Sequence, residues 1–293
     1  MNSICLLLID EKSISEKIIL KSFSQILNSK IKKIYVIGNK NKFKKIYSRS
    51  IKYEKFIFIN IENDLADNFL FLKKATNEAL KLFKSNKIKY LINMPINKKK
   101  FLKNNFAGYT EFFSFMCKDK KKENMLLYNN NFSVCPLTTH VELKKVDKCI
   151  TKKKIIFTTK NISKFYKKIN KKIKIVYLGL NPHAGIDLGK NSKEQTVIKP
   201  TIKLLQKKNY PIIGPVSADT AFRKTTNKVF IGNYHDQVLI PFKLINNFNG
   251  INITIGKKFI RMSPDHGTGK NLNSSDFVSN ESFLECIKFC EKY

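Results

Sequence analysis

Residues 55–94 read KFIFINIENDLADNFLFLKKATNEALKLFKSNKIKYLINM, and this stretch decides the fold class. An apolar run rich in Phe and Ile at 55–61 predicts a strand, and the amphipathic pattern at 65–84 predicts a helix. A second apolar run at 89–94 predicts another strand. Because a helix that joins two strands normally returns the chain in parallel, the segment indicates an α/β protein.

The same alternation continues along the chain. Further strands are expected at 4–9, 33–37, 173–180 and 228–234, and a further amphipathic helix at 14–27. The pattern predicts a layered α/β/α fold with a mixed, largely parallel sheet. We expect one subdomain from residues 1–107 plus 272–293, with a C-terminal helix at about 274–292 that packs back on the N-terminal half. Residues 108–271 would form a central subdomain that binds metal and substrate.

The composition argues against a specific nucleic-acid partner. With 293 residues and 42% hydrophobic side chains the chain is long enough for a large core, and its formal net charge is +34. Only three of its 56 basic residues are arginines, the residue that base readout and bidentate phosphate contacts favour. The lysines are spread over the whole length, which is typical of solvated surface.

Cysteine usage and the N-terminus favour a cytoplasmic protein. The six cysteines include no CxxC pair and no dense framework, which is typical of a reducing compartment. The start, MNSICLLLIDEKS, lacks the basic region of a signal peptide, and no apolar run approaches the length of a membrane span.

The four histidines each follow an apolar run, at positions His140, His183, His235 and His266. Taken singly, each is more often a structural histidine than a ligand. If the fold gathers these strand ends on one edge, three neutral imidazoles would hold a divalent ion and leave a position for substrate. The long separations in sequence give no local metal signature, so both interpretations stay open.

Two cations near these loops also suggest a site. Arg261 lies between Phe259-Ile260 and an Asp-His-Gly turn, where a planar guanidinium suits a phosphate or a carboxylate. Lys243 follows the run VLIPF, which we expect to lead the chain through apolar core. Nine of the eleven glycines lie in the second half of the chain, which points to that half for most of the site.

An ordered set of motifs carries a family resemblance. It comprises GYTEFF (108–113), TTH (138–140), GLNPHAG (179–185), GPVSADTAF (214–222), YHDQ with PFK (234–243) and GINITIGKKFIR followed by DHGTG (250–269). Together these motifs resemble the 4-hydroxythreonine-4-phosphate dehydrogenases of vitamin B6 biosynthesis. The resemblance implies a fold like that of isocitrate and isopropylmalate dehydrogenases, with two intertwined subdomains, and a homodimer with its active site at the subunit interface.

The implied reaction is the NAD-dependent oxidation of 4-phosphooxy-L-threonine, followed by decarboxylation to 3-amino-2-oxopropyl phosphate. NADP is the alternative cofactor. The resemblance maps the ligands of a divalent metal (Zn, Mg or Co) onto His140, His183 and His235. It maps substrate contacts onto Thr110, Lys243, Asn252 and Arg261, with Tyr109 where the family has a histidine. The cofactor would contact the turn formed by Asp265, His266, Gly267 and Thr268.

Several alternatives remain at this stage. Asp236, Asp265 and Lys243 are all candidates for the catalytic general base. Because Tyr109 is neutral and longer than histidine, a related metal- and NAD-dependent dehydrogenase of another phosphorylated hydroxy acid, such as a phospho-threonate, is a second hypothesis. An inactive scaffold that serves as a basic binding protein is the third.

Overall fold

The chain forms two units, one inserted into the other along the sequence. Unit 1 comprises residues 1–122 and 248–293, and unit 2 comprises residues 123–247. The computed structural model describes residues 2–62, 67–118, 123–247, 249–269 and 278–293. The boundaries between the units fall at 122/123 and 247/248, and not at the expected positions 107/108 and 271/272. Unit 1 also takes in the helix that follows residue 108, which packs against the helix at 68–84, and the hairpin before residue 265, which pairs with the strand at 90–93.

Unit 1 contains strands in the order β3-β2-β1-β4-β11-β10. The strands are β1 (Ser3–Leu7), β2 (Lys33–Gly38), β3 (Phe56–Asn60), β4 (Tyr90–Asn93), β10 (Ile251–Ile255) and β11 (Ile260–Pro264). All neighbours pair in parallel except β10 and β11, which form an antiparallel hairpin. The mixed, largely parallel sheet predicted from the sequence is therefore confirmed in this unit.

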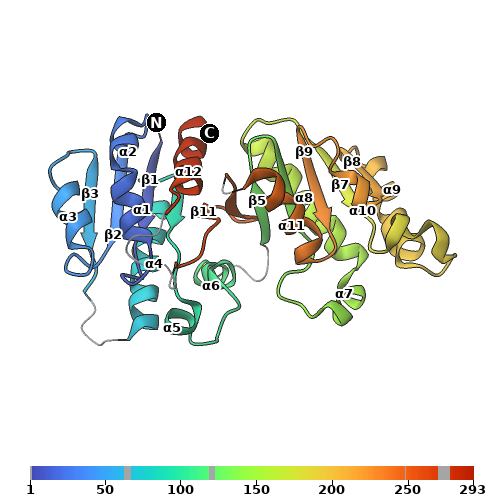
Figure 1. The fold of residues 1–293 in the computed structure, drawn as a ribbon, viewed down its shortest axis with the longest axis horizontal. Helices are drawn as coiled ribbons and strands as arrows, with labels where there is room; N and C mark the ends of the chain where they lie inside the picture. Colours follow the sequence, from blue (N-terminus) through green and yellow to red (C-terminus); the bar gives the residue numbers. More distant parts are fainter. Residues whose placement is uncertain (1, 63–66, 119–122, 248, 270–277) are drawn as a thin grey trace. The chain divides into compact units, whose positions relative to one another are not determined.

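Helices cover both faces of this sheet (Figure 1). They are α1 (Ser15–Lys21), α2 (Phe23–Asn28), α3 (Lys44–Ser50), α4 (Asn68–Lys84), α5 (Lys98–Leu102), α6 (Tyr109–Met116) and α12 (Glu281–Lys292). Successive side chains of β4 point to opposite faces of the sheet. Tyr90 contacts Phe289 of α12 on one face, and Leu91 joins the apolar cluster under α4 on the other. The C-terminal helix thus packs back on the N-terminal half, as expected.

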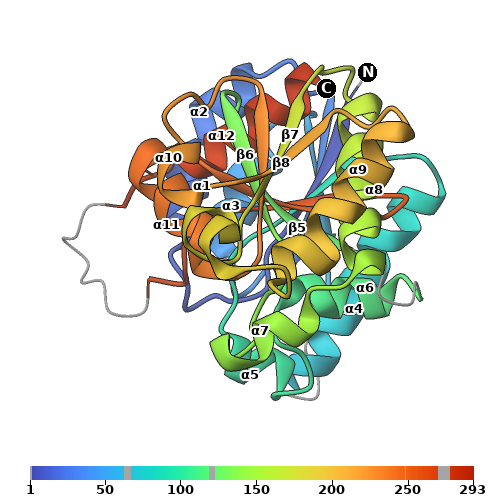
Figure 2. The same ribbon diagram turned by 90° about the vertical axis from the view of Figure 1, so that its right-hand side faces the viewer.

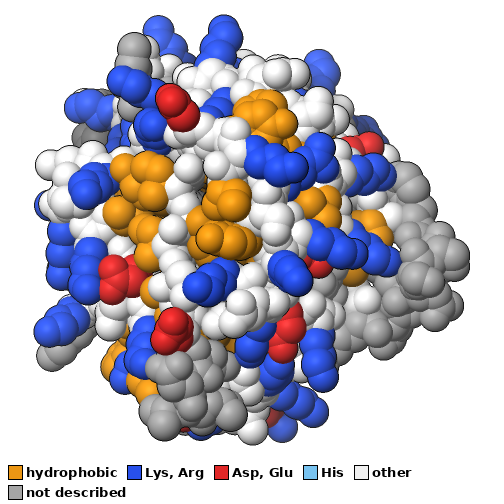
Figure 3. All heavy atoms as spheres, turned by 90° about the vertical axis from the view of Figure 1, so that its left-hand side faces the viewer, with side chains coloured by type: hydrophobic (Ala, Val, Ile, Leu, Met, Phe, Trp, Pro, Cys, Tyr) orange, Lys and Arg blue, Asp and Glu red, His pale blue; other side chains and the backbone are white. Residues whose placement is uncertain are grey.

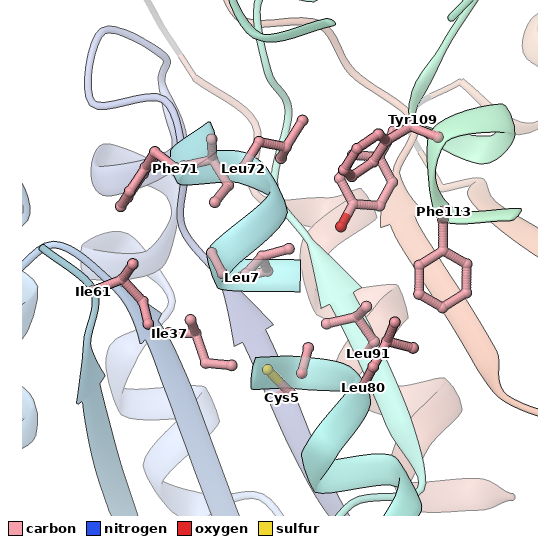
Figure 4. Close-up of a cluster of buried hydrophobic side chains, with 14 of the residues drawn as sticks. Cys5, Leu7, Ile37, Ile61, Phe71, Leu72, Leu80, Leu91, Tyr109 and Phe113 are labelled. Carbon is pink, nitrogen blue, oxygen red and sulfur yellow. The ribbon is translucent and has the colours of Figure 1, made fainter. Parts of the chain in front are cut away.

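The core between α4 and the sheet extends to α6. Cys5 and Leu7 of β1, Leu91 of β4, and Tyr109 and Phe113 of α6 belong to one buried cluster (Figure 4). The ring of Tyr109 therefore lies within apolar packing.

Unit 2 contains strands in the order β5-β6-β9-β7-β8. They are β5 (Asn124–Tyr128), β6 (Phe132–Pro136), β7 (Lys174–Leu178), β8 (Ile212–Val216) and β9 (Lys228–Gly232). Only the β5–β6 pair is antiparallel, and β6, β9, β7 and β8 run in parallel. The carboxyl ends of β6, β9 and β7 therefore meet along one edge.

The helices of unit 2 lie on two sides of its sheet, with α8 and α9 on one side and α10 and α11 on the other (Figure 2). They are α7 (Leu143–Cys149), α8 (Lys152–Lys168), η1 (Pro182–Leu188), η2 (Glu194–Ile198), α9 (Lys199–Lys207), α10 (Ala218–Ala221) and α11 (His235–Asn246). Unit 2 is accordingly a second α/β/α layer structure.

Three segments differ in detail from expectation. The helix predicted at 14–27 is divided at Ser22 into α1 and α2. The C-terminal helix begins at Glu281, and residues 274–277 of the expected helix lie outside the described residues. The run VLIPF forms part of α11, which buries Val238 and Phe242 and leaves Lys243 exposed.

In the described part of the chain, no helix combines the length and apolar character needed to cross a membrane.

Candidate functional site

Three of the four histidines follow three adjacent parallel strands of unit 2. His140 follows β6, His235 follows β9 and His183 follows β7, and β9 lies between the other two. The sheet order therefore brings the three histidine loops to one edge, as the sequence hypothesis required. His266 instead follows β11 of unit 1.

Buried amides hold these loops together. Asn233, fully buried, donates from Nδ2 to the carbonyl of Leu178 at 3.0 Å and accepts from the hydroxyl of Tyr177 at 2.9 Å. Its carbonyl accepts the hydroxyl of Thr138 at 2.7 Å. The side chain of Gln237 accepts from the Asn233 N–H at 2.7 Å and donates to the carbonyl of Gly179 at 2.8 Å. This network fixes the exits of β6, β9 and β7 relative to one another.

The imidazole of His235 lies near that of His140. Their ring centroids are 6.3 Å apart. The Nδ1 atom of His235 is 2.6 Å from the Asp236 carboxylate, and the Nδ1 atom of His183 is 2.9 Å from that of Asp187. Both bonds leave Nε2 as the ring nitrogen available for a ligand, which is the arrangement that carboxylates impose on metal-binding histidines.

The loop that carries His183 has an unusual backbone. His183, Ala184 and Gly185 all adopt left-handed φ angles, of 51°, 54° and 68°. Left-handed conformations cost non-glycine residues roughly 1–2 kcal/mol each. The buried carboxylate of Glu194 braces the turn by accepting the N–H of Asn181 at 2.8 Å and its side-chain amide at 3.1 Å. The hydrogen bond to Asp187 raises the pKa of the exposed His183 imidazole above its ordinary value.

The donor set fits a metal ion only in part. Two imidazoles lie near one another, and two carboxylates orient His183 and His235. Among the described residues of the chain, however, no three His, Cys, Asp or Glu side chains lie close enough together to hold an ion.

Unit 1 contributes a buried cation. Arg261 of β11 is 2% exposed. Its Nε donates to Oδ1 of Asn93, and its Nη1 donates to the hydroxyls of Thr110 at 3.3 Å and Thr254 at 3.2 Å. The Tyr109 ring lies over the guanidinium, with its centroid 4.8 Å from Cζ. Burial lowers the pKa of Arg261 to about 10, so the side chain stays protonated at neutral pH.

The neighbouring residues of the hairpin face the same side as Arg261. Thr254 pairs with Arg261 across the hairpin, and Asn252 pairs with Ser263. Because residues two apart on a strand share a face, Asn252 faces the same side of the hairpin as Arg261. Its Oδ1 is buried and has no hydrogen-bond partner in the described part of the chain. An unpartnered buried amide of this kind is a candidate acceptor for a ligand donor.

The turn 265–268 follows β11 directly. The backbone N–H of Asp265 donates to the Ser282 hydroxyl at 2.7 Å, and the carbonyl of Thr268 accepts from Ile14 at 3.0 Å. No atom of the residues described lies within 4 Å of the position that a Cβ on Gly267 would occupy, which leaves room there for a ligand to approach the backbone. The Nε2 atom of His266 is shielded from solvent and finds no partner among the residues described.

The predicted residues thus form two groups. Tyr109, Thr110 and Arg261 come together in unit 1, with Asn252 on the same side of the hairpin as Arg261, and the turn 265–268 follows the strand of Arg261. His140, His183, His235 and Asp236 lie along one sheet edge in unit 2, where Lys243 is exposed two turns into α11.

Five supporting residues were not predicted from the sequence. They are Thr76, Asn93, Glu194, Asn233 and Gln237. Asn233 and Gln237 flank a histidine within one motif, which is a usable signal. Thr76, Asn93 and Glu194 are polar residues in helical or strand patterns, and only their burial distinguishes them.

Comparisons with known proteins agree with this geometry. Residues 5–290 match the family model described as pyridoxal phosphate biosynthetic protein PdxA. The 4-hydroxythreonine-4-phosphate dehydrogenase of Sulfurihydrogenibium sp. is 33% identical over 95% of this chain and 94% of its own length.

Solved structures show the same fold. The crystal structure of 4-hydroxythreonine-4-phosphate dehydrogenase from Klebsiella pneumoniae has a TM-score of 0.82 at 22% identity, covering 99% of this chain and 98% of that one. Isocitrate dehydrogenase from Methylococcus capsulatus has a TM-score of 0.51 at 9% identity, covering 100% and 87% of the two chains, which confirms the predicted fold class. With its family model matched over nearly its whole length and its histidine loops on one sheet edge, the chain belongs to the PdxA family of pyridoxal phosphate biosynthetic proteins.

Proposed function

We propose that this protein oxidises 4-phosphooxy-L-threonine with NAD and releases 3-amino-2-oxopropyl phosphate and carbon dioxide, in pyridoxine 5'-phosphate biosynthesis. The observation that carries the proposal is the placement of His140, His235 and His183 at the ends of three adjacent strands, in a chain of the PdxA family. The dehydrogenases of this family use a nicotinamide cofactor, for which NADP is the alternative.

His140, His183 and His235 would hold a divalent ion, with Zn, Mg or Co as candidates. The ion would supply Lewis acidity at the substrate hydroxyl that is oxidised. The carboxylates of Asp187 and Asp236 would fix the imidazoles of His183 and His235 with Nε2 available. The 6.3 Å separation of the His140 and His235 rings supports this role.

Within unit 1, three side chains are suited to hold the substrate: those of Arg261, Thr110 and Asn252. Arg261 and Thr110 are suited to its phosphate, because a buried guanidinium and a hydroxyl 3.3 Å apart present directed donors. Asn252 would accept a hydrogen bond through its Oδ1, which has no partner among the described residues. Within unit 2, Lys243 of α11 is the residue expected to contact the substrate.

For the general base, the three candidates differ in their surroundings. Asp236 contacts His235 at 2.6 Å, which suits an orienting role better than proton abstraction. Asp265 would contact the cofactor, together with the rest of its turn, His266, Gly267 and Thr268. We therefore favour Lys243 as the base, since it is exposed on the helix that His235 begins.

A second copy of this chain would complete the site. Seven exposed large apolar side chains of unit 2 follow the three histidines within ten residues: Val141, Leu143, Ile186, Leu188, Ile240, Leu244 and Ile245. Apolar side chains exposed beside a proposed active site support a homodimer whose interface contains that site. The partner would then bring further ligands to the metal.

We also expect the protein in the cytoplasm, because all six cysteines are free thiols. A basic nucleic-acid-binding role is not favoured. On the face seen in Figure 3, basic side chains (Lys and Arg) are spread among apolar and other side chains.

The test is turnover by the purified protein with NAD and 4-phosphooxy-L-threonine, in the presence of Zn, Mg or Co. We expect NADH and carbon dioxide in equal amounts, and a loss of at least a hundredfold in kcat for His235→Ala. A flat NADH signal with every metal would defeat the proposal. Phospho-threonate and phospho-erythronate, assayed in parallel, decide whether a related hydroxy acid is the better substrate.

A further inference from the structure

The guanidinium of Arg261 donates its hydrogen bonds to neutral acceptors, and the carboxylate of Glu111 acts on it only through its charge. The hydrogen bonds of Arg261 to described residues go to one amide oxygen and two hydroxyls, and they use Nε and Nη1. Within the described ranges of the chain, Nη2 is the donor nitrogen that forms no hydrogen bond. A buried charge without a bonded carboxylate is costly, and a site that retains one has it available for an anionic ligand.

Tyr109 closes one face of that guanidinium. Its ring centroid lies 4.8 Å from Cζ, and its hydroxyl bonds to Thr76 of α4 at 3.1 Å. Both Tyr109 and Thr76 are buried, at 7% and 0% exposure. Figure 4 shows the Tyr109 ring reaching into the cluster that contains Leu7 and Leu91. The hydroxyl is therefore engaged inside unit 1, and burial raises its pKa above the ordinary value.

Asn93 binds the Nε edge of the Arg261 guanidinium. It ends β4, the strand next to β11, and is 3% exposed. Its Oδ1 accepts from Nε of Arg261, and its own amide donates to the carbonyl of Met94 at 3.3 Å. The amide thus has a defined orientation, with the oxygen toward the cation.

We propose that Asn93, Tyr109 and Thr76 are positioning residues that hold Arg261 in one orientation, so that Nη2 is presented to the phosphate of the substrate. Tyr109 acts through its ring, and its hydroxyl contacts Thr76 and not the ligand. The inference rests on the proposed function for the identity of the ligand. It deepens that function by assigning specificity at this site to the geometry of the guanidinium.

A double-mutant cycle tests the assignment of the tyrosine. Tyr109→Phe and Thr76→Val remove the same hydrogen bond, so each should raise KM for 4-phosphooxy-L-threonine by about threefold, and the double variant by no more. Tyr109→Leu also removes the ring and should raise KM by about tenfold. Thr159→Val, which alters a buried helical hydroxyl of unit 2, is the control and should leave KM unchanged. A larger effect of Tyr109→Phe than of Thr76→Val, adding in the double variant, would mean that the hydroxyl reaches the ligand, and the assignment would be overturned.

The isosteric change Asn93→Asp tests the other edge. A carboxylate there would pair with the guanidinium, so KM should rise at least tenfold while kcat stays within about twofold and the melting temperature is retained or raised. An unchanged KM in a folded variant would overturn the role of Asn93.

Binding of inorganic phosphate separates this inference from the proposed function. The rise of the melting temperature with phosphate concentration needs neither NAD nor turnover. If the wild type gives no NADH but phosphate stabilises it, and Asn93→Asp abolishes that effect, the proposed function fails and the inference stands. If phosphate stabilises wild type and Asn93→Asp alike, or neither, the inference fails.

Discussion

The carboxylate of Glu194 accepts the backbone N–H of Asn181 at 2.8 Å, across 13 residues of chain. Glu194 is fully buried, and Asn181 is the residue that enters the left-handed turn at His183. The bond therefore couples the helical segment η2 to the conformation of a proposed metal ligand.

Loss of this carboxylate should destabilise the protein. Glu194→Ala leaves the Asn181 N–H without its partner, which costs about 1–3 kcal/mol of unfolding free energy. Glu142→Ala, which removes an exposed carboxylate that pairs with Lys144 and Lys145, should change stability by less than about 0.5 kcal/mol. Urea denaturation of both variants measures the difference, and equal effects would contradict the proposed brace.

A methyl group at Gly185 should meet the same carboxylate. A Cβ at this position would lie 2.6 Å from Oε2 of Glu194, on a backbone whose φ is +68°. Gly185→Ala should therefore destabilise more in the wild type than in the Glu194→Ala background, with a coupling energy of about 1 kcal/mol or more. Purely additive unfolding energies would show that the left-handed φ alone sets the cost.

Metal affinity should depend on His140 and His235, which lie at one sheet edge of unit 2. His140→Ala and His235→Ala should abolish binding of Zn or Co in competition with a chromophoric chelator. Asp236→Asn, which keeps the ligand but weakens its orientation, should lower affinity about 10–100-fold. His266→Ala, in the other unit, serves as the control, and a comparable loss of affinity there would count against the assignment.

The oligomeric state should depend on α11. Leu244 is 75% exposed on this helix, and Leu244→Glu should convert a dimer into a monomer in light-scattering measurements, with loss of activity. Ile51→Glu alters a side chain of unit 1 that is 59% exposed and should leave the mass unchanged. A monomeric wild type, or dissociation by the Ile51 change alone, would refute the proposed interface.

The pH dependence of the unfolding free energy should reflect the burial of His266. Burial lowers the pKa of His266 in the folded protein below its ordinary value near 6.5. As the pH falls below about 6.5, the unfolded chain takes up a proton on this imidazole that the folded chain does not. The folded protein therefore loses stability between this pH and the lower pKa of His266 in the fold. The unfolding free energy of wild type minus that of His266→Gln should therefore fall from about pH 7.5 to about pH 5.5. A constant difference would show that His266 is as solvated in the fold as in the unfolded chain.

Sequence patterns located most elements but not their interruptions. The apolar runs at 33–37 and 89–94 match β2 and β4 closely, because strands that are buried on both faces need continuous apolar residues. The helix expected at 14–27 is divided at Ser22, where Asn280 donates to the serine hydroxyl at 2.8 Å. That contact spans 258 residues, so no local pattern records it.

What the sequence by itself determined is the α/β class and the set of chemical groups, since periodicity reflects burial and the motifs carry imidazoles, lysine and arginine. Only the tertiary structure decided their arrangement. The order β6-β9-β7 places His235 between His140 and His183, although the chain visits β7 before β9. The buried residues Asn93, Glu194 and Asn233 gain their roles through contacts made across more than ten residues, which depend on how strands and helices pack and not on neighbours in the chain.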